Sequence, residues 1–176
     1  MPGAERRRRI QELLDYVELT DRAHDLAGKF SGGMKRRLMI ARALMHRPGM
    51  LFLDEPTTGL DPQTRRKIWD LIRRMNGEGM TVLLTTHYIE EADALCRRVG
   101  IMDRGRLIAL DTPAELKKKV GEIVVEAHKQ GETEYRFFTG REQALEYAGN
   151  LTKNVTIREA NLEDVFVELT GRKVGD

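Results

Sequence analysis

Two adjacent carboxylates, Asp54 and Glu55, follow directly after a short apolar run at residues 50–53. Such a run is typical of a strand that is buried on both faces of a parallel sheet. A strand that ends in two carboxylates can place the first on Mg²⁺ and the second beside an attacking water. Asp54 is therefore the predicted metal ligand and Glu55 the predicted general base. The alternative is that both carboxylates only cap the turn after the strand.

The tract Ser31-Gly32-Gly33 stands immediately before a segment whose apolar residues recur with helical spacing. The first N–H groups of a helix have no partner inside the helix and attract anions, and glycine lets the backbone come close to a ligand. The tract is thus a predicted phosphate-binding surface. A serine cap next to glycine is also common in ordinary loops, so the tract alone is a weak signal.

Asp61 and His87 complete the candidate site. Asp61 precedes Pro62, which is the pattern of a helix cap followed by proline at the first helical position. His87 follows a second apolar run at residues 81–85 and can donate to or accept from a terminal phosphate near neutral pH. Either residue alone has an ordinary structural explanation. The order and spacing of all these elements would rarely arise by chance.

The elements that must position these residues alternate between helix and strand. The first 30 residues are predicted to be helical, with an amphipathic stripe at 10–17, a new helix cap at Thr20-Asp21 and a loop at 28–29. Helix 34–45, strand 50–53, helix 62–77, strand 81–85 and helix from 88 to 96 are predicted to follow. This alternation is typical of an α/β fold with a parallel sheet. A hairpin around residues 103–106 and a short helix opened by Thr112-Pro113 follow.

Gly121 is the predicted domain boundary. Residues 1–120 form the main domain, with a helical part at 1–47 and a core at 48–120. Residues 121–176 form a small α+β appendage, with strands predicted at 123–127, 135–138 and 155–158 and helices at 141–147 and 162–169.

Charge and composition exclude several functions. The 176 residues contain 30 Lys and Arg against 28 Asp and Glu, so the whole chain lacks the charge of a nucleic-acid binder. The basic runs at 6–9 and 35–47 are interpreted as solvated helix faces, or alternatively as groups near phosphates or anionic lipids. A lone Cys96 cannot form an intramolecular disulfide and fits a reducing cytosol. An intracellular location is expected.

These motifs resemble the C-terminal part of the nucleotide-binding domain of ABC transporters, from about residue 9 to residue 119. Ser31, Gly32 and Gly33 match the signature motif of that family. Asp54 and Glu55 match its Walker B pair, Asp61 its D-loop and His87 its switch histidine. The resemblance implies part of a P-loop NTPase-like fold, with a helical signature subdomain and parallel strands flanked by helices.

The resemblance also implies cofactors and partners. The cofactors are ATP and Mg²⁺, and the partners are a transmembrane permease and a second nucleotide-binding domain in a head-to-tail dimer. In that dimer the signature of one domain contacts ATP held by the other. Phe30 and Met34 resemble the bacterial drug- and polysaccharide-exporter branch more than the importers, and the tail at 161–171 resembles multidrug exporters of the daunorubicin-resistance type. The expected location is cytoplasmic, at the inner face of the membrane through the permease.

Three elements that precede the signature in the family are not found in the 176 residues: the P-loop, the stacking aromatic ahead of it and the glutamine loop. The 176 residues contain no Gly-x-x-x-x-Gly-Lys-Ser/Thr loop to bind ATP phosphates. The expected function is an ATP-hydrolysing exporter subunit that is inactive as this chain alone. The alternative is a non-catalytic module that supplies its signature in trans, and a third possibility is a DNA-repair ATPase, which normally has long heptads or a basic face. Uncovered sheet edges and an uncovered apolar face are also expected.

Overall fold

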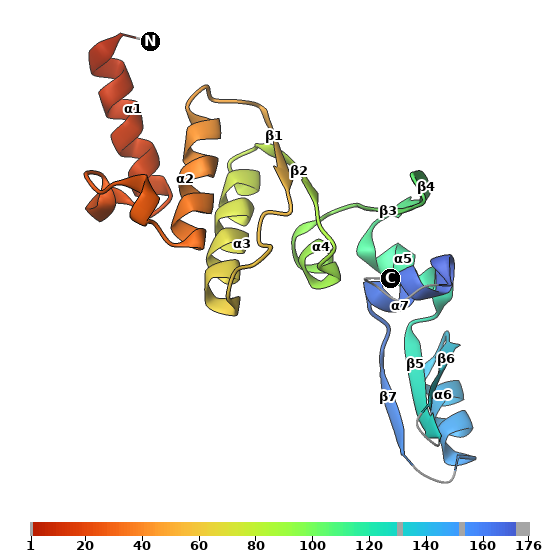
Figure 1. Ribbon diagram of the computed structural model, residues 1–176. Helices are drawn as coiled ribbons and strands as arrows, with labels where there is room; N and C mark the ends of the chain where they lie inside the picture. The colour runs from red at the N-terminus through yellow and green to blue at the C-terminus, as the bar shows by residue number, and fades with distance from the viewer. Residues whose placement is uncertain (1, 130–131, 152–153, 172–176) are drawn as a thin grey trace. The chain divides into compact units, whose positions relative to one another are not determined.

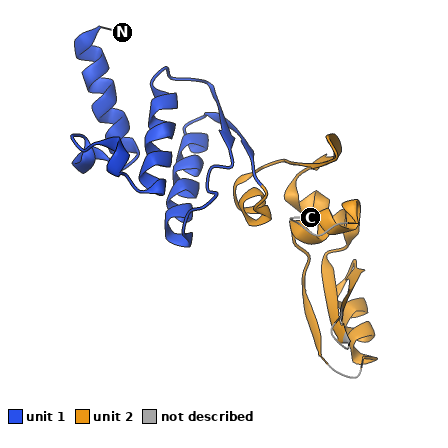
Figure 2. Cartoon of the chain, viewed as in Figure 1, with its two compact units in different colours: residues 1–86 blue, residues 87–176 orange. Residues whose placement is uncertain are grey.

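The structure, a computed structural model, describes residues 2–129, 132–151 and 154–171. Helices and strands alternate along the chain (Figure 1), which confirms the predicted α/β class. The chain divides into two units, residues 1–86 and 87–176 (Figure 2). The boundary predicted at Gly121 falls inside the second unit and stays a prediction. Among the described residues, no helix has the length and apolar character that crossing a membrane requires.

Unit 1 begins with a helix that ends where the predicted amphipathic stripe at 10–17 ends. Helix α1 spans Gly3–Tyr16, and two single 3₁₀ turns follow, η1 at Thr20–Arg22 and η2 at Ala27–Lys29. The backbone of Glu18 has a φ of 57°, in the left-handed region. A helix cannot continue through that conformation, so α1 ends before the predicted cap at Thr20-Asp21. The helical structure predicted from that cap to residue 30 is reduced to these two short turns.

The remaining elements of unit 1 are two helices and two strands. Helix α2 (Gly32–Leu44) leads into strand β1 (Met50–Asp54), and helix α3 (Pro62–Gly77) leads into strand β2 (Thr81–Thr85). The two strands pair in parallel from Met50 with Thr81 to Asp54 with Thr85. Helix α2 contacts both α1 and α3, and α3 packs against β2. The predicted strand, helix and strand are confirmed.

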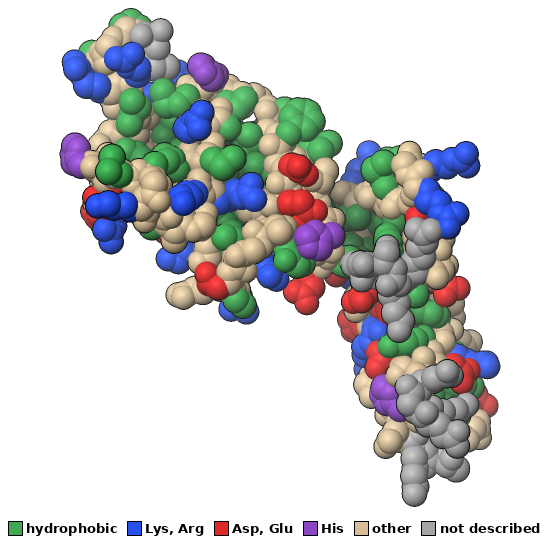
Figure 3. All heavy atoms as spheres, viewed as in Figure 1, with side chains coloured by type: hydrophobic (Ala, Val, Ile, Leu, Met, Phe, Trp, Pro, Cys, Tyr) green, Lys and Arg blue, Asp and Glu red, His purple; other side chains and the backbone are tan. Residues whose placement is uncertain are grey.

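Burial of this sheet on both faces was predicted and is wrong for unit 1. Leu51 is buried, but Phe52 is 68% exposed and Leu83 is 46% exposed. Successive side chains of a strand point to opposite faces, so these exposures mark one face as covered and the other as open. Figure 3 shows hydrophobic side chains remaining at the surface of this unit. The uncovered apolar face that the sequence led us to expect is therefore present.

Arginines tie the helices of unit 1 together. Arg9 of α1 donates to the carbonyl of Leu44 at 3.0 Å, and Arg37 of α2 donates to the carbonyl of Val17 at 2.8 Å. Arg74 of α3 donates to a carbonyl at the end of α1 at 3.2 Å. Reading the basic runs as solvated helix faces is therefore wrong for Arg9 and Arg37. Both side chains are largely buried, and their charged ends donate to carbonyl groups.

Unit 2 begins with a short helix and a hairpin. Helix α4 (Ile89–Leu95) precedes strands β3 (Val99–Asp103) and β4 (Arg106–Asp111), and helix α5 (Pro113–Val120) follows. Arg104 and Gly105 both have positive φ, as a two-residue hairpin turn requires. The predicted hairpin and helix are confirmed. A small core forms where α5 packs against helix α7 (Leu162–Thr170), from Ile101, Leu116, Leu162 and Val165.

The rest of unit 2 is an antiparallel sheet with one helix on it. Strands β6 (Glu132–Phe138), β5 (Ile123–Lys129) and β7 (Val155–Glu159) lie side by side in that order. Helix α6 (Arg141–Gly149) contacts all of them. The predicted sequence of strand, strand, helix, strand and helix beyond Gly121 is confirmed.

One arginine joins this sheet to α7. Arg158 on β7 donates through Nε to Glu126 on β5 at 2.6 Å, and through Nη1 and Nη2 to both carboxylate oxygens of Asp164 on α7. Asp164 is also half of the capping box that starts α7 with Asn161. The hydrogen bonds to Asp164 raise the pKa of Arg158 above its ordinary value. A bidentate arginine pair fixes geometry as well as charge.

The substitution Arg158→Ala should destabilise unit 2 by about 1–3 kcal/mol, because it leaves two carboxylates partly buried without their cation. The matched control is Lys118→Ala, which removes an exposed i,i+3 pair with Glu115 and should cost less than about 0.5 kcal/mol. Chemical denaturation of both variants measures the difference. Equal losses for the two variants would contradict this account of Arg158.

Candidate functional site

The predicted site residues of unit 1 meet where two helices begin and two strands end. Strands β1 and β2 end side by side at Asp54 and Thr85. Helix α2 begins after Ser31, and helix α3 begins after Asp61. A Cβ on Gly32 would lie 3.4 Å from Leu60, so the start of α2 is in contact with the loop that leads into α3. The structure thus brings the signature tract Ser31–Gly33 against the segment 55–60 that follows Asp54. This segment is called the carboxylate turn below.

Asp54 stands at the end of β1 with its carboxylate held from one side. Thr85 of β2 donates its hydroxyl to the Asp54 carboxylate. One carboxylate oxygen remains to take a second partner, since a carboxylate accepts at several positions. Mg²⁺ commonly binds proteins through one or two carboxylates together with substrate phosphates. Asp54 therefore fits the predicted metal role, and that role stays a prediction.

Glu55 holds an unusual backbone conformation. Its φ is 47°, a left-handed value that costs a residue with a side chain roughly 1–2 kcal/mol. Its N–H donates to the carbonyl of Thr85 at 3.0 Å, and its side chain accepts from the hydroxyl of Thr58 at 2.9 Å. Its own carbonyl accepts from Nη2 of Arg36 on α2 at 2.8 Å. Strained residues of this kind are concentrated at functional sites, where the surroundings hold them in place.

Ser31 caps α2 and leaves its hydroxyl hydrogen available. Its Oγ accepts from the N–H of Met34 at 3.2 Å. The hydroxyl can still donate to an anion in front of the helix, beside the N–H groups of the first turn. Ser31 and Gly32 are both exposed. This donor set fits the phosphate role predicted for the tract.

Packing between α2 and α3 requires glycine at position 33. A Cβ built on it would lie 2.2 Å from Cγ2 of Thr64, in the first turn of α3. Thr64 cannot turn away freely, because its hydroxyl and its N–H both bond to Asp61. The two helices therefore approach more closely at this point than any side chain on residue 33 would allow.

Asp61 has a structural role. It is the N-cap of α3 and accepts from the N–H of Thr64 at 2.9 Å. Hydrogen bonds from Thr64 hold the pKa of Asp61 below its ordinary value. The helix cap suggested by the sequence is confirmed, and contact between Asp61 and a nucleotide stays a prediction.

His87 begins the second unit. Its ring lies 4.3 Å from the ring of Tyr88, at a tilt of 39°. The residue is exposed. Its approach to the carboxylates and to a terminal phosphate stays a prediction.

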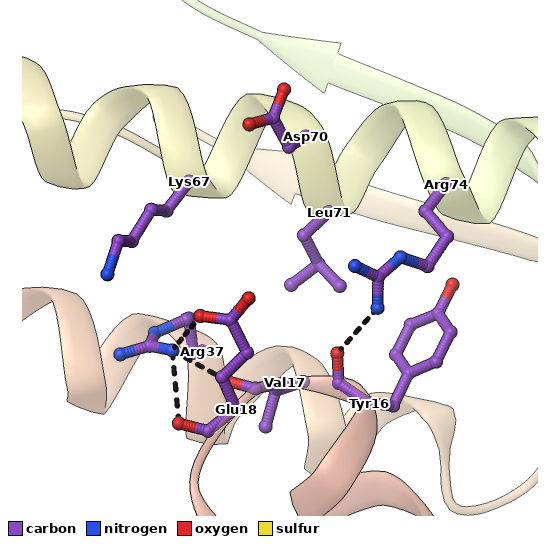
Figure 4. A pocket seen from close by; sticks show the side chains of 8 residues that line it. All are labelled: Tyr16, Val17, Glu18, Arg37, Lys67, Asp70, Leu71 and Arg74. Atoms are coloured by element: carbon purple, nitrogen blue, oxygen red, sulfur yellow. Dashed lines mark hydrogen bonds and ion pairs between the residues drawn. The ribbon is translucent and has the colours of Figure 1, made fainter.

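A small cavity in unit 1 lies among α1, α2 and α3 (Figure 4). Its volume of about 50 Å³ is too small for a nucleotide, since ligand pockets usually hold several hundred Å³. The lining residues are Tyr16, Val17, Glu18, Arg37, Lys67, Asp70, Leu71 and Arg74. Burial and the nearby Glu78 carboxylate raise the pKa of Tyr16 to about 12. The hydrogen bonds in Figure 4 join α2 and α3 to the end of α1. We therefore interpret the cavity as a packing gap between these helices.

Sequence reasoning missed the residues that hold the site in place. Thr58 and Thr85 contact the two carboxylates, and Arg36 contacts the turn between them and α3. The two threonines lie within four residues of a motif, but nothing in their spacing marks them. Arg36 is one of several adjacent basic residues, so only the structure distinguishes it.

Comparison with known proteins identifies the family of this chain. The sequence profile of the family described as ABC transporter matches residues 4–58. The linearmycin resistance ATP-binding protein LnrL of Bacillus subtilis is 37% identical over 98% of this chain. The chain belongs to the ABC transporter ATP-binding family. The daunorubicin resistance ATP-binding protein DrrA2 of Streptomyces coeruleorubidus is 39% identical over 97% of the chain.

A solved structure gives the fold. The protein cbiO1 from Clostridium perfringens, part of the ABC transporter complex cbiONQ, is 34% identical with a TM-score of 0.62. The match covers 66% of this chain and 47% of cbiO1. The matches cover 66% of the LnrL sequence and 63% of the DrrA2 sequence, so the chain spans slightly less than two thirds of these relatives.

The substitution Gly33→Ala should destabilise the chain by about 1–3 kcal/mol, because the new methyl group collides with Thr64. Adding Thr64→Ser removes the colliding methyl group while keeping the hydroxyl, and it should restore most of the loss. The free energy of unfolding in urea measures both effects.

The control for this pair is Gly28→Ala, since a Cβ on Gly28 has no neighbour within 4 Å. We expect its effect to stay within about 1 kcal/mol in either direction. A Gly33→Ala loss that Thr64→Ser does not relieve would show that residue 33 is constrained by something other than α3.

Proposed function

We propose that this chain is part of the ATP-hydrolysing subunit of an ABC-type exporter of the drug-resistance type. The observation that carries the proposal is the junction of α2, β1 and α3, where Asp54 and the strained Glu55 follow β1 and Arg36 ties Glu55 to the helix that begins at the anion-attracting tract. In the proposal the two carboxylates act on one ATP and the helix start acts on the ATP of a second domain. Phosphoryl transfer depends mainly on positioning and electrostatic stabilisation, which this junction can supply.

Each residue has a separate role in the proposal. Asp54 holds Mg²⁺, and Glu55 orients and deprotonates the attacking water. Ser31 and the N–H groups of Gly32 and Gly33 bind the terminal phosphate of ATP carried by a second nucleotide-binding domain. Asp61 orders the loop at the dimer interface, and His87 contacts the terminal phosphate. Bound Mg²⁺ neutralises the charge on the phosphates.

The proposed partners follow from the family. A second nucleotide-binding domain pairs head to tail with this one, and a transmembrane permease receives the mechanical work. The subunit then lies in the cytoplasm at the inner face of the membrane. Relatives named for resistance to linearmycin and daunorubicin support export of a drug-like substrate.

Turnover by a chimeric subunit tests the role of Glu55. The chimera joins this chain to the segment of the linearmycin relative that, by family order, precedes the signature and carries the P-loop. We expect ATP hydrolysis that falls about 10²-fold to 10⁴-fold with Glu55→Gln, because the amide cannot accept a proton. The readout is phosphate release at saturating ATP.

The control for the chimera is Glu5→Gln, an equivalent change in an exposed residue of α1. Its turnover should match that of the parent chimera. A chimera that hydrolyses ATP equally well with and without Glu55 would contradict the assignment of the base.

A second candidate function is a non-catalytic module that acts only on a partner's ATP. The observation that favours it is that Ser31 and Asp61 are exposed at adjoining helix starts. In this case Ser31 is essential and Glu55 is dispensable.

A complementation assay tests this second candidate. The partner is a full-length drug-resistance subunit whose own signature serine is replaced by arginine, which blocks phosphate contact in its homodimers. Adding this chain should restore ATP turnover, Glu55→Gln should restore it equally, and Ser31→Arg should not restore it. Turnover that is restored equally by Ser31→Arg would rule out action through the signature.

A further inference from the structure

Three neighbouring basic residues on α2 do different work. Lys35 is exposed to solvent. Arg37 donates to the carbonyls of Val17 and Glu18, toward the end of α1. Arg36 instead donates to the carbonyl of Glu55 at 2.8 Å, in a partly buried position. Of these three residues, Arg36 is the one that donates to the residue proposed as the base.

The Glu55 carbonyl is the group through which the turn can be held. The left-handed φ of Glu55 turns its carbonyl out of the β1 ladder, and Thr58 offers it only a long N–H contact of 3.4 Å. A charged guanidinium is a stronger donor than an amide and compensates better for the loss of ladder geometry. Without Arg36, the turn would keep its strained conformation and lose a charged hydrogen-bond donor.

The helix that carries Arg36 is the helix that begins at the signature. Gly33 fixes the start of α2 against Thr64 of α3, and Arg36 fixes the next turn of α2 against Glu55. The position of the carboxylate turn is therefore set by the same helix that presents Ser31 to a phosphate.

We propose that Arg36 is a positioning residue for Glu55, which holds the turn in its left-handed conformation and ties it to the signature helix. This inference rests on the proposed function for the meaning of Glu55 as a base. The contact itself can be tested in the chain without nucleotide.

Hydrogen exchange of the backbone amides in the nucleotide-free chain measures how much Arg36 stabilises the turn. The reporters are the amides of Glu55 and Leu60, which bond to Thr85 and Thr57. Arg36→Ala should speed their exchange by about tenfold or more, relative to amides in the middle of α3, because one charged hydrogen bond is lost. Lys35→Ala is the matched control and should leave the ratio unchanged.

Two further readouts separate positioning from general stability. Arg36→Lys should recover part of the protection, since an ammonium group also donates to the carbonyl. The ¹³Cα chemical shift of Glu55 should move in Arg36→Ala away from its left-handed value and return partly in Arg36→Lys. If Arg36→Ala does not fold, the test uses Arg36→Lys instead. The exchange ratio and the Glu55 chemical shift should then change in the same direction by a smaller amount.

Equal exchange ratios and an unchanged Glu55 shift in Arg36→Ala and Lys35→Ala would overturn the proposal. Exchange that rises equally in the turn and in α3 would also overturn it, because that pattern means general destabilisation. No arm uses ATP, so a failure of the proposed function would appear in the turnover assays and not here.

Discussion

The close approach between the start of α2 and the first turn of α3 is the constraint on which the site depends. It is possible because residue 33 has no Cβ, which would meet the Thr64 methyl group at 2.2 Å. This contact brings the capped start of α2 beside the loop that follows Glu55. Without this close approach, Arg36 would lie too far from the Glu55 carbonyl to donate to it. The second glycine of the tract is thus required by packing inside the chain, in addition to any ligand.

Arginine bonds to carbonyl groups stabilise the layers around that contact. Arg9 and Arg37 link α1 and α2, and Arg36 links α2 to the end of β1. In unit 2, Arg158 joins two strands to α7 through carboxylates instead. A guanidinium group has several donors in a fixed plane, which lets one side chain hold more than one element. Several of the arginines on this chain therefore stabilise internal structure.

The sequence predicts the elements well where periodicity and caps agree. The strand at Met50, the helix capped by Asp61 and the arrangement beyond Gly121 all follow from local pattern. The burial of β1 and β2 could not be predicted in the same way. An apolar run shows that a strand has side chains suited to burial, but it does not show which neighbouring elements cover each face. The left-handed conformation of Glu55 and its hydrogen bond with Arg36 cannot be predicted from the local sequence, because both depend on contacts between distant segments.

The contact between Gly33 and Thr64 can be measured directly in solution. A nuclear Overhauser spectrum of the folded chain should contain a strong cross-peak between the α-protons of Gly33 and the γ-methyl group of Thr64. That result would place α2 against α3 as the site requires. A well-resolved spectrum with no such cross-peak would contradict the account, because the signature tract and the carboxylate turn would then not form one structural unit.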